Sequence, residues 1–318
     1  SASMISGTEI DERQGCGMGV VCNLPVLREE KEGCRLTLTV AHLRGGHSGV
    51  EIDKGRANAN ILMGRLLFRL QNELPLGIAE YCGGSRVNAI ASHAEAEILI
   101  EKSRLTEYEE HIKQMEAIFR KEYHASDPDI SVNLKLSESG CFSVLDEASA
   151  ARMISLLLIL PDGMQEMSAE MPGLVQTSCN LGAASLQESA FTFTSSIRSC
   201  METKKMMLAE KIMRIVVLTG GSAALEGDYP GWSYQPDSRL KETLINAYQK
   251  VCGIKASAEA VHAGMECGIF AAGIPNLDCV SIGPTMGDVH TPQEHLSISS
   301  VQRTWKVLLT ALEDARYL

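Results

Sequence analysis

A loop near the end of the chain carries the residue types most suggestive of chemistry. Residues 283–294 read GPTMGDVHTPQE and follow an apolar run, residues 277–282, that predicts a buried strand. The loop presents His290 together with the carboxylates of Asp288 and Glu294. Open α/β folds place their chemistry on such loops, at the carboxyl ends of strands. A lone loop histidine is usually solvated, so this segment needs support from other motifs.

Further candidate residues lie in glycine-rich turns. His47 belongs to RGGHSG, residues 44–49, where glycines allow the backbone to approach a ligand. His262 and Glu266 flank a strand-to-helix turn in HAGMECG. Taken by itself, His47 is more simply explained by a role in its turn.

Polar side chains also interrupt strand-like segments. Asn88 follows the Gly-Gly turn of GGSRVNAI, where an amide often just caps the turn. QTSCNLG, residues 176–182, carries an amide, and IRS carries Arg198. An arginine on an apolar strand either pairs with a carboxylate of the fold or faces a ligand. Its fork geometry suits the carboxylate of a substrate.

The elements that must position these residues follow a regular order. Periodicity predicts strands at 35–40, 78–82, 94–100 and 130–136 and helices at 56–74 and 107–123. This β-α-β-β-α-β order is typical of an antiparallel sheet with helices on one face. The pattern α-β-β-α then recurs at 147–160, 174–184, 190–198 and 203–218. The antiparallel architecture therefore looks doubled, in a wide sheet whose edge could pair with a second subunit.

Residues 223–318 differ in character, because strand and helix patterns alternate there. Helices are predicted at 238–251, 264–272 and 299–315, and strands at 256–261 and 277–282. This alternation indicates parallel α/β structure. We assign residues 1–33 to the same part, since the apolar stretch 20–24 offers it an edge strand. The prediction is an α/β (α+β) chain in which a partial parallel domain, 1–33 and 223–318, is interrupted by an antiparallel domain, 34–222. Two or three strands are too few for a parallel sheet covered on both faces, so we expect the first third of that domain to be missing.

Composition limits the partners. The net charge of −11 argues against nucleic acid or an anionic membrane surface as the main partner. The longest apolar run, residues 153–160, is too short to span a membrane. Residues 1–13 carry no signal-peptide pattern. The 10 cysteines form no Cys-x-x-Cys pair, which favours reduced thiols and a cytoplasmic location.

Eight motifs in one order resemble a known family. In chain order they are GGHSG, NAN, GGSRVNAI, QTSCNLG, IRS, YPGW, HAGMECG and SIGPTMGDVHTPQE. The set resembles the aminoacyl-histidine (Xaa-His, beta-alanyl-histidine or carnosine-type) dipeptidases, which belong to the co-catalytic zinc peptidases. The match extends from about residue 15 to the C-terminus.

The resemblance implies that the antiparallel domain is a lid or dimerisation domain within a catalytic α/β domain. His47 is similar to the lid histidine that stabilises the tetrahedral intermediate and reaches a neighbouring active site in dimeric relatives. Asn88 and Arg198 are similar to lid residues that hold the substrate and its free carboxylate. The implied partners are a small peptide substrate and a second copy of the chain, as a homodimer through the lid.

The resemblance also implies a metal centre. His290 is similar to a zinc ligand, and His262 and Glu266 are similar to residues that line the pocket beside the metals. Two zinc ions would polarise the scissile carbonyl and lower the pKa of a bridging water. A carboxylate base would move protons to the leaving amine. The implied activity is zinc-dependent hydrolysis of Xaa-His dipeptides.

The sequence departs from the family in the metal ligands that precede the lid. The first metal His, the bridging Asp and a Glu pair have no counterpart here. The position of another carboxylate ligand matches Gly7, which cannot coordinate a metal, and a slip of one or two residues would offer Glu9 or Asp11 instead. A catalytic zinc needs about three protein ligands. We therefore expect a fragment or truncated homologue that neither holds two zinc ions nor cleaves peptides efficiently by itself.

Two alternatives stay open. One is a non-catalytic homologue that serves as a dimerisation or ligand-binding module. The other is a related amidohydrolase that acts on N-acyl amino acids.

Overall fold

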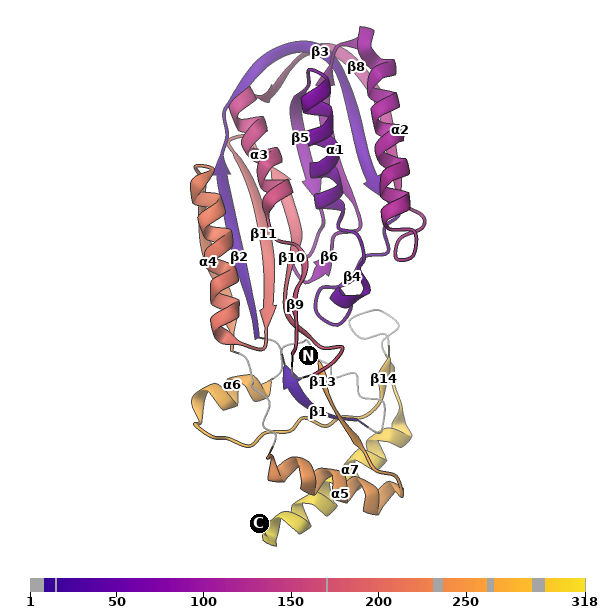
Figure 1. The fold of residues 1–318 in the computed structure, drawn as a ribbon, viewed down its shortest axis with the longest axis vertical. Coiled ribbons are helices and arrows are strands. Elements are labelled where there is room, and N and C mark those ends of the chain that lie inside the picture. The colour runs from indigo at the N-terminus through magenta and orange to yellow at the C-terminus, as the bar shows by residue number, and fades with distance from the viewer. Residues whose placement is uncertain are drawn as a thin grey trace.

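The chain folds into a tall antiparallel layer and a smaller α/β part. The computed structural model describes residues 9–14, 16–169, 171–230, 237–261, 266–287 and 295–317; for 9–14, 16, 258–261, 266 and 317 it describes only the backbone. Figure 1 shows the antiparallel layer above and the α/β part, which contains the C-terminal helices, below it.

A nine-stranded sheet forms the antiparallel layer. Its strands are β2 (Cys16–Pro25), β3 (Arg28–Ala41), β5 (Gly77–Gly83), β7 (Ala94–Ile100), β8 (Ser131–Leu145), β9 (Gly163–Met167), β10 (Val175–Leu186), β11 (Ala190–Ser199) and β12 (Ser222–Tyr229). The order is β12-β2-β11-β10-β5-β7-β3-β8, and β9 pairs with β10 beside this path. Every pair in this sheet is antiparallel.

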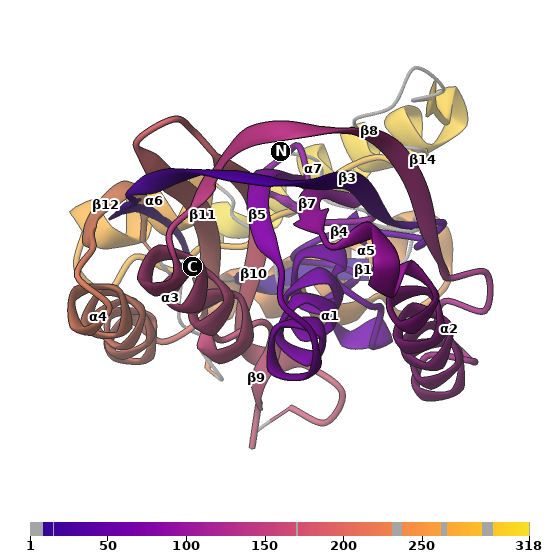
Figure 2. The same cartoon turned by 90° about the horizontal axis from the view of Figure 1, so that it is seen from above.

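Four helices cover one face of this sheet, as Figure 2 shows. They are α1 (Ala59–Glu73), α2 (Leu105–Glu122), α3 (Glu147–Ile159) and α4 (Glu202–Leu218). Alternate residues of β11, among them Phe191, Phe193 and Ile197, are buried in the core cluster, while the residues between them are only half-buried. A strand with one buried and one open face has this period-2 pattern. None of the described helices is both long and apolar enough to span a membrane.

The antiparallel layer is built from two copies of one unit. The first runs β3-α1-β5-β7-α2-β8 along the chain and has the sheet order β5-β7-β3-β8. The second runs β2-α3-β10-β11-α4-β12 and has the equivalent order β10-β11-β2-β12. The units meet where β5 pairs with β10, with Gly83 opposite Ala184 and Cys82 opposite Ser185. The predicted β-α-β-β-α-β plan and its doubling are confirmed.

The prediction that residues 20–24 supply an edge strand to the α/β part is wrong. These residues belong to β2, which pairs with β11 on one side and β12 on the other. Val20, Cys22 and Leu24 are all fully buried in the main core. β2 adds an apolar strand to the second unit, and α4 packs against it. The sheet thus extends beyond the expected limits of 34 and 222.

The α/β part contains a parallel pair of strands and three helices. β1 (Glu9–Gln14) pairs in parallel with β13 (Ser257–Val261). The helices are α5 (Arg239–Cys252), α6 (Glu266–Gly273) and α7 (Ile298–Asp314). α5 and α7 pack through a small cluster that includes Leu244, Ala247 and Val307. The short elements are β4 (Gly46–His47), β6 (Ala89–Ile90), β14 (Met286–Gly287), β15 (His295–Leu296), η1 (Ile52–Lys54), η2 (Lys102–Arg104) and η3 (Ala315–Tyr317).

The strand predicted at 277–282 does not form. Only Ser281 makes an isolated bridge, and the run is half-buried. Val280 and Ile282 instead pack beside the α5–α7 cluster. Apolar side chains alone cannot distinguish a strand from a packed coil, because a strand also needs a partner to complete its ladder.

Candidate functional site

The RGGHSG and GGSRVNAI motifs meet in a short ribbon. β4 pairs antiparallel with β6, and His47 lies opposite Ala89. The Ser48 amide also donates to the Asn88 carbonyl at 3.0 Å. In Figure 1, β4 and β6 lie at the end of the large sheet that faces the α/β part. The fold therefore brings His47 and Asn88 together, although η1, α1 and β5 lie between them in the chain.

Hydrogen bonds select the tautomer of His47. Its Nδ1 atom accepts from the amides of Gly49 at 3.1 Å and Val50 at 3.2 Å. A nitrogen that accepts two N–H groups carries the lone pair, so the proton of the neutral ring is on Nε2. The loop therefore makes the Nε2–H group of His47 a hydrogen-bond donor.

The carboxylate of Glu51 closes the loop around His47. It accepts from the His47 amide at 2.9 Å and pairs with Arg56 at 2.9 Å. Burial raises the pKa of Glu51, but the His47 amide, Lys54 and Arg56 outweigh it and bring this pKa below its ordinary value. Gly46 has a φ of 138°, and a Cβ there would lie 2.7 Å from Glu51 Oε2. The positive φ favours glycine at this position, and any side chain would also displace the ends of Glu51 and Arg56.

Asp127 anchors both ends of the same loop. It is fully buried, and its two carboxylate oxygens accept from the amides of Arg44 at 2.7 Å and Ala57 at 2.9 Å. Backbone amides are good partners for a buried carboxylate because each one satisfies a lone pair. Asp127 thus fixes the points where the His47 loop leaves β3 and enters α1.

Residues 86–90 lie directly on β10. Gly84 has a φ of 66°, and a Cβ on it would lie 2.0 Å from the Gly182 carbonyl oxygen. A Cβ on Gly182 would lie 2.6 Å from the Val87 oxygen and 2.7 Å from the Arg86 oxygen. Backbone-to-backbone contact therefore explains Gly84 of GGSRVNAI and Gly182 of QTSCNLG.

We expect Gly182→Ala to lower the free energy of unfolding by about 1–3 kcal/mol, because the new methyl overlaps rigid backbone. Urea denaturation measures this change. Gly17→Ala is the matched control, since a Cβ there would be 3.9 Å from its nearest neighbour, the Ile197 oxygen. Equal stability of the two variants would contradict the contact.

A buried polar network supports the same contact from within the layer. Asn58 Nδ2 donates to Asp162 Oδ1 at 2.8 Å, and the Leu181 amide donates to the same oxygen at 2.8 Å. Asn60 Nδ2 donates to the Leu181 carbonyl at 3.1 Å and accepts from the Tyr81 hydroxyl at 2.9 Å. The NAN motif at the start of α1 is thereby joined to QTSCNLG.

The network predicts a pH dependence of stability. Burial raises the pKa of Asp162 to about 6, although hydrogen bonds from Leu181 and Asn58 oppose the rise. Between the ordinary pKa of an aspartate and this raised pKa, the folded state holds a proton that the unfolded state has lost. The contribution of protonated Asp162 to the free energy of unfolding is therefore present in full below about pH 4 and is lost as pH rises through about 6. Asp162→Asn should remove the dependence, which corresponds to about 2–3 kcal/mol.

Urea denaturation at pH 4.5 and 7.5 tests this prediction. The difference in unfolding free energy between Asp162→Asn and the unchanged chain should grow in favour of the variant as pH rises. Asp129→Asn, at an exposed carboxylate, should show no such trend. Parallel pH profiles for Asp162→Asn and the unchanged chain would contradict the role of Asp162.

Arg198 lies in a pocket of about 370 Å³ on the sheet face opposite the four helices. The pocket is lined by Gly17, Met18, Gly19, Val21, Val87, Thr194, Ser196, Arg198, Glu226, Gly227 and Tyr229. Arg198 Nε is buried and has no hydrogen-bond partner among the described residues. Burial lowers the pKa of the guanidinium, but an arginine remains charged near neutral pH. A half-buried cation with one buried N–H group of this kind is suited to an incoming anion.

The pocket also connects Arg198 to the loop of Asn88. Val87, the residue before Asn88, forms part of its wall, and the Asn88 side chain is exposed. Of the predicted site residues, the structure thus gathers His47, Asn88 and Arg198. His262 and His290 lie outside the described residues, as does Gly7. For Glu9, Asp11 and Glu266 only the backbone is described.

The described residues do not by themselves fit a zinc centre. Among them, no three His, Cys, Asp or Glu side chains gather closely enough to hold a metal ion.

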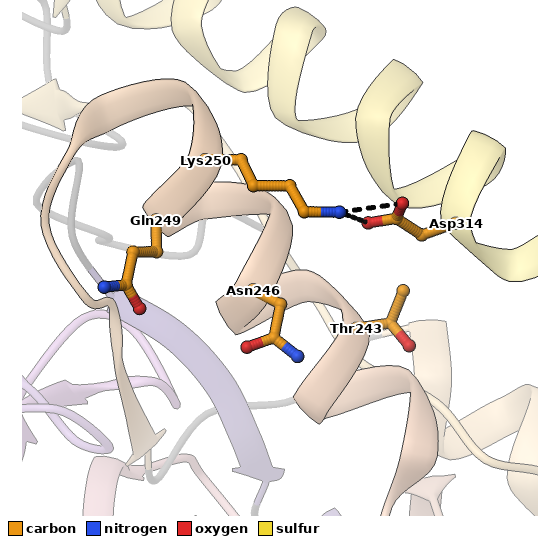
Figure 3. Close-up of a pocket in the computed structure, with 5 residues that line it drawn as sticks. All are labelled: Thr243, Asn246, Gln249, Lys250 and Asp314. Carbon is orange, nitrogen blue, oxygen red and sulfur yellow. Dashed lines mark hydrogen bonds and ion pairs between the residues drawn. The ribbon is translucent and has the colours of Figure 1, made fainter.

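A second hollow, of about 420 Å³, lies between α5 and α7. Figure 3 shows its lining residues, Thr243, Asn246, Gln249, Lys250 and Asp314. Lys250 Nζ is paired with both oxygens of Asp314, at 2.9 and 2.8 Å. The two charges satisfy each other, and we assign this hollow no chemical role.

Comparison with known proteins identifies part of the chain. Residues 39–127 match the family model described as the peptidase dimerisation domain. The chain carries a peptidase dimerisation domain. The matched residues run from the end of β3 through α2 to Asp127 and include the loops of His47 and Asn88.

Two relatives extend the likeness over almost the whole chain. The cytosol non-specific dipeptidase of Escherichia coli (strain K12) is 30% identical over 321 residues, which cover 98% of this chain and 66% of that protein. The crystal structure of aminoacylhistidine dipeptidase from Vibrio alginolyticus matches with a TM-score of 0.89 and 31% identity, over 98% of this chain and 64% of that one. The family resemblance and fold class inferred from the motifs are confirmed. The chain spans just under two thirds of each relative's length.

Proposed function

We propose that this chain forms the lid and the C-terminal segment of a zinc-dependent dipeptidase that hydrolyses Xaa-His, carnosine-like dipeptides. The observation that carries the proposal is the convergence of His47, Asn88 and the Arg198 pocket at one end of the sheet. The similarity to two dipeptidases supports the same reaction class.

Each of the three residues contacts a different part of the dipeptide. Arg198 binds the free carboxylate of the dipeptide, because its buried Nε–H group has no partner among the described residues. Asn88 holds the peptide from the exposed tip of its loop. His47 donates from Nε2 to the oxygen on which negative charge develops as the scissile carbonyl becomes tetrahedral.

We propose zinc as the metal of the complete active site and His290 as one of its ligands. His262 and Glu266 would line the pocket beside it. The peptidase relatives support the metal only in general terms, and the described residues add no ligand set of their own.

The division into domains follows the sheet. We propose a lid of residues 16–229 and an α/β domain that comprises β1 and residues 237–317. We further propose that two copies pair through the lid, consistent with the dimerisation-domain match. We propose a cytoplasmic location, in line with the name of the E. coli relative.

An exchange chimera tests the proposed activity. This chain replaces the aligned region of the E. coli dipeptidase, and hydrolysis of β-alanyl-histidine and of an N-acetyl amino acid is measured with zinc supplied. We expect turnover of the dipeptide and not of the N-acetyl compound, and little turnover by the 318-residue chain alone. A folded chimera that prefers the N-acetyl amino acid, or cleaves neither, would overturn the proposal.

A further inference from the structure

Asn180 is a buried amide on an otherwise open face of the sheet. Its neighbours in β10, Cys179 and Leu181, belong to the core under the helices, so the Asn180 side chain points to the opposite face. Asn180 is nevertheless only 1% exposed. The loop of residues 86–90 buries it.

The hydrogen bonds of Asn180 bracket a single loop residue. Its Nδ2 atom donates to the Val87 carbonyl at 3.0 Å and to the Ala89 carbonyl at 2.9 Å. Asn88 lies between these two residues, and its own carbonyl accepts from the Ser48 amide. The backbone on both sides of Asn88 is therefore tied down, while its side chain is exposed.

The orientation of this amide is fixed by its partners. Both acceptors are carbonyl oxygens, so a flipped amide would place Oδ1 against them and lose both bonds. Oδ1 is left buried without a partner among the described residues. A buried acceptor without a partner costs stability, and such groups in native structures call for an explanation beyond packing.

Asn180 also stands next to the Arg198 pocket. In the β10–β11 ladder it lies opposite Ser196, and the next same-face pair joins Ser178 to Arg198. Ser196, Arg198 and Val87 all line that pocket. Asn180 is thus the side chain that links the Asn88 loop to the row of the sheet that carries the pocket.

We infer that Asn180 is a positioning residue for substrate: its amide fixes the backbone on both sides of Asn88, so that the Asn88 side chain is placed to contact a substrate bound in the Arg198 pocket. It acts through Asn88 and needs no contact with the substrate itself. The inference rests on the proposed function, because it takes Asn88 and Arg198 as the groups that bind the dipeptide.

A double-mutant cycle tests the inference in the 318-residue chain. The probe is β-alanyl-histidine, and calorimetric titration gives its dissociation constant for the unchanged chain, Asn180→Ser, Asn88→Ala and the double variant. We expect each single substitution to weaken binding by about tenfold, the scale of one lost hydrogen-bonded contact. The double variant should be no weaker than Asn88→Ala, because the effect of Asn180 passes through Asn88.

Two measurements keep a change in stability apart from a change in positioning. Amide hydrogen exchange of Ser48, which donates to Asn88, should speed up in Asn180→Ser, while exchange in the core of β7 stays slow. Ser195→Ala is the control, since it removes a buried hydroxyl from the neighbouring strand without touching the loop. It should leave both binding and Ser48 exchange unchanged. Asn180→Asp sets a carboxylate oxygen against the two carbonyls of Val87 and Ala89. A folded Asn180→Asp variant should therefore bind the dipeptide more weakly, and exchange the Ser48 amide faster, than Asn180→Ser.

The outcomes separate the two claims. Equal binding by Asn88→Ala and the double variant supports the inference. Additive losses, or an Asn180→Ser variant that binds as well as the unchanged chain while Asn88→Ala does not, overturn it and leave the proposed function standing. A folded chain in which Asn88→Ala has no effect on binding overturns the proposed role of Asn88, and the inference with it.

Discussion

Replacing His47 by alanine should lower kcat for β-alanyl-histidine by about 10²–10³-fold, the usual cost of removing one oxyanion donor. The reason lies in the tautomer. Gly49 and Val50 hold Nδ1 as an acceptor, so Nε2 carries the proton and can donate to a developing oxyanion. KM should change little, because this interaction strengthens only as the carbonyl becomes tetrahedral.

The exchange chimera with the E. coli dipeptidase is the assay for this variant. His124→Ala is the matched control, because His124 is exposed and its Nδ1 makes a local contact with the Lys121 carbonyl oxygen at 3.2 Å. It should retain full activity. An unchanged kcat for His47→Ala, or a loss confined to KM, would show that His47 serves ground-state binding or the turn alone.

Replacing Arg198 by glutamine should weaken binding of β-alanyl-histidine by about 10- to 100-fold, since a hydrogen-bonded ion pair contributes about 1.5–3 kcal/mol. The pocket supplies the physical reason. Burial lowers the pKa of the guanidinium, and its buried Nε has no partner among the described residues. A carboxylate would satisfy that group at little further desolvation cost to the arginine.

The C-terminal amide of β-alanyl-histidine isolates this interaction. The unchanged chain should bind the amide as weakly as Arg198→Gln binds the acid, and the variant should no longer distinguish the two ligands. Arg214→Gln, at an exposed arginine of α4, should bind both ligands as the unchanged chain does. Discrimination between acid and amide that survives in Arg198→Gln would place the carboxylate elsewhere.

Local patterns predicted most of the antiparallel layer. A strand or helix with one buried face has a periodic pattern of apolar residues, which can be read from the sequence. This pattern predicted β3, β11, α1 and α2. The roles of β2 and β12 could not be read in this way. The first unit is inserted between β2 and α3, so the partner of β2 is β11, far along the chain. Apolar residues show that a strand is buried and do not show against what.

The residues of the candidate site were also only partly predictable from the sequence. His47, Asn88 and Arg198 stand out because each is a polar residue in a motif of glycines or apolar strand residues. Asp127 gave no such signal, since an acidic residue after a surface helix is usually solvated. Its partners, Arg44 and Ala57, are 83 and 70 residues away, and only the folded chain shows the contact. Asn180 was visible as an amide within a strand, but its function depends on a loop that crosses the sheet face.

Locating the dipeptide on the chain tests the proposed binding site most directly. A ¹⁵N chemical-shift titration of the 318-residue chain with β-alanyl-histidine reports every amide near the ligand. We expect the largest shifts on residues 17–21, 86–90 and 194–198, with a common dissociation constant, and we expect Arg198→Gln to weaken binding at all three segments together. Shifts concentrated around Lys250 and Asp314, or no saturable shifts at all, would contradict the proposed binding site.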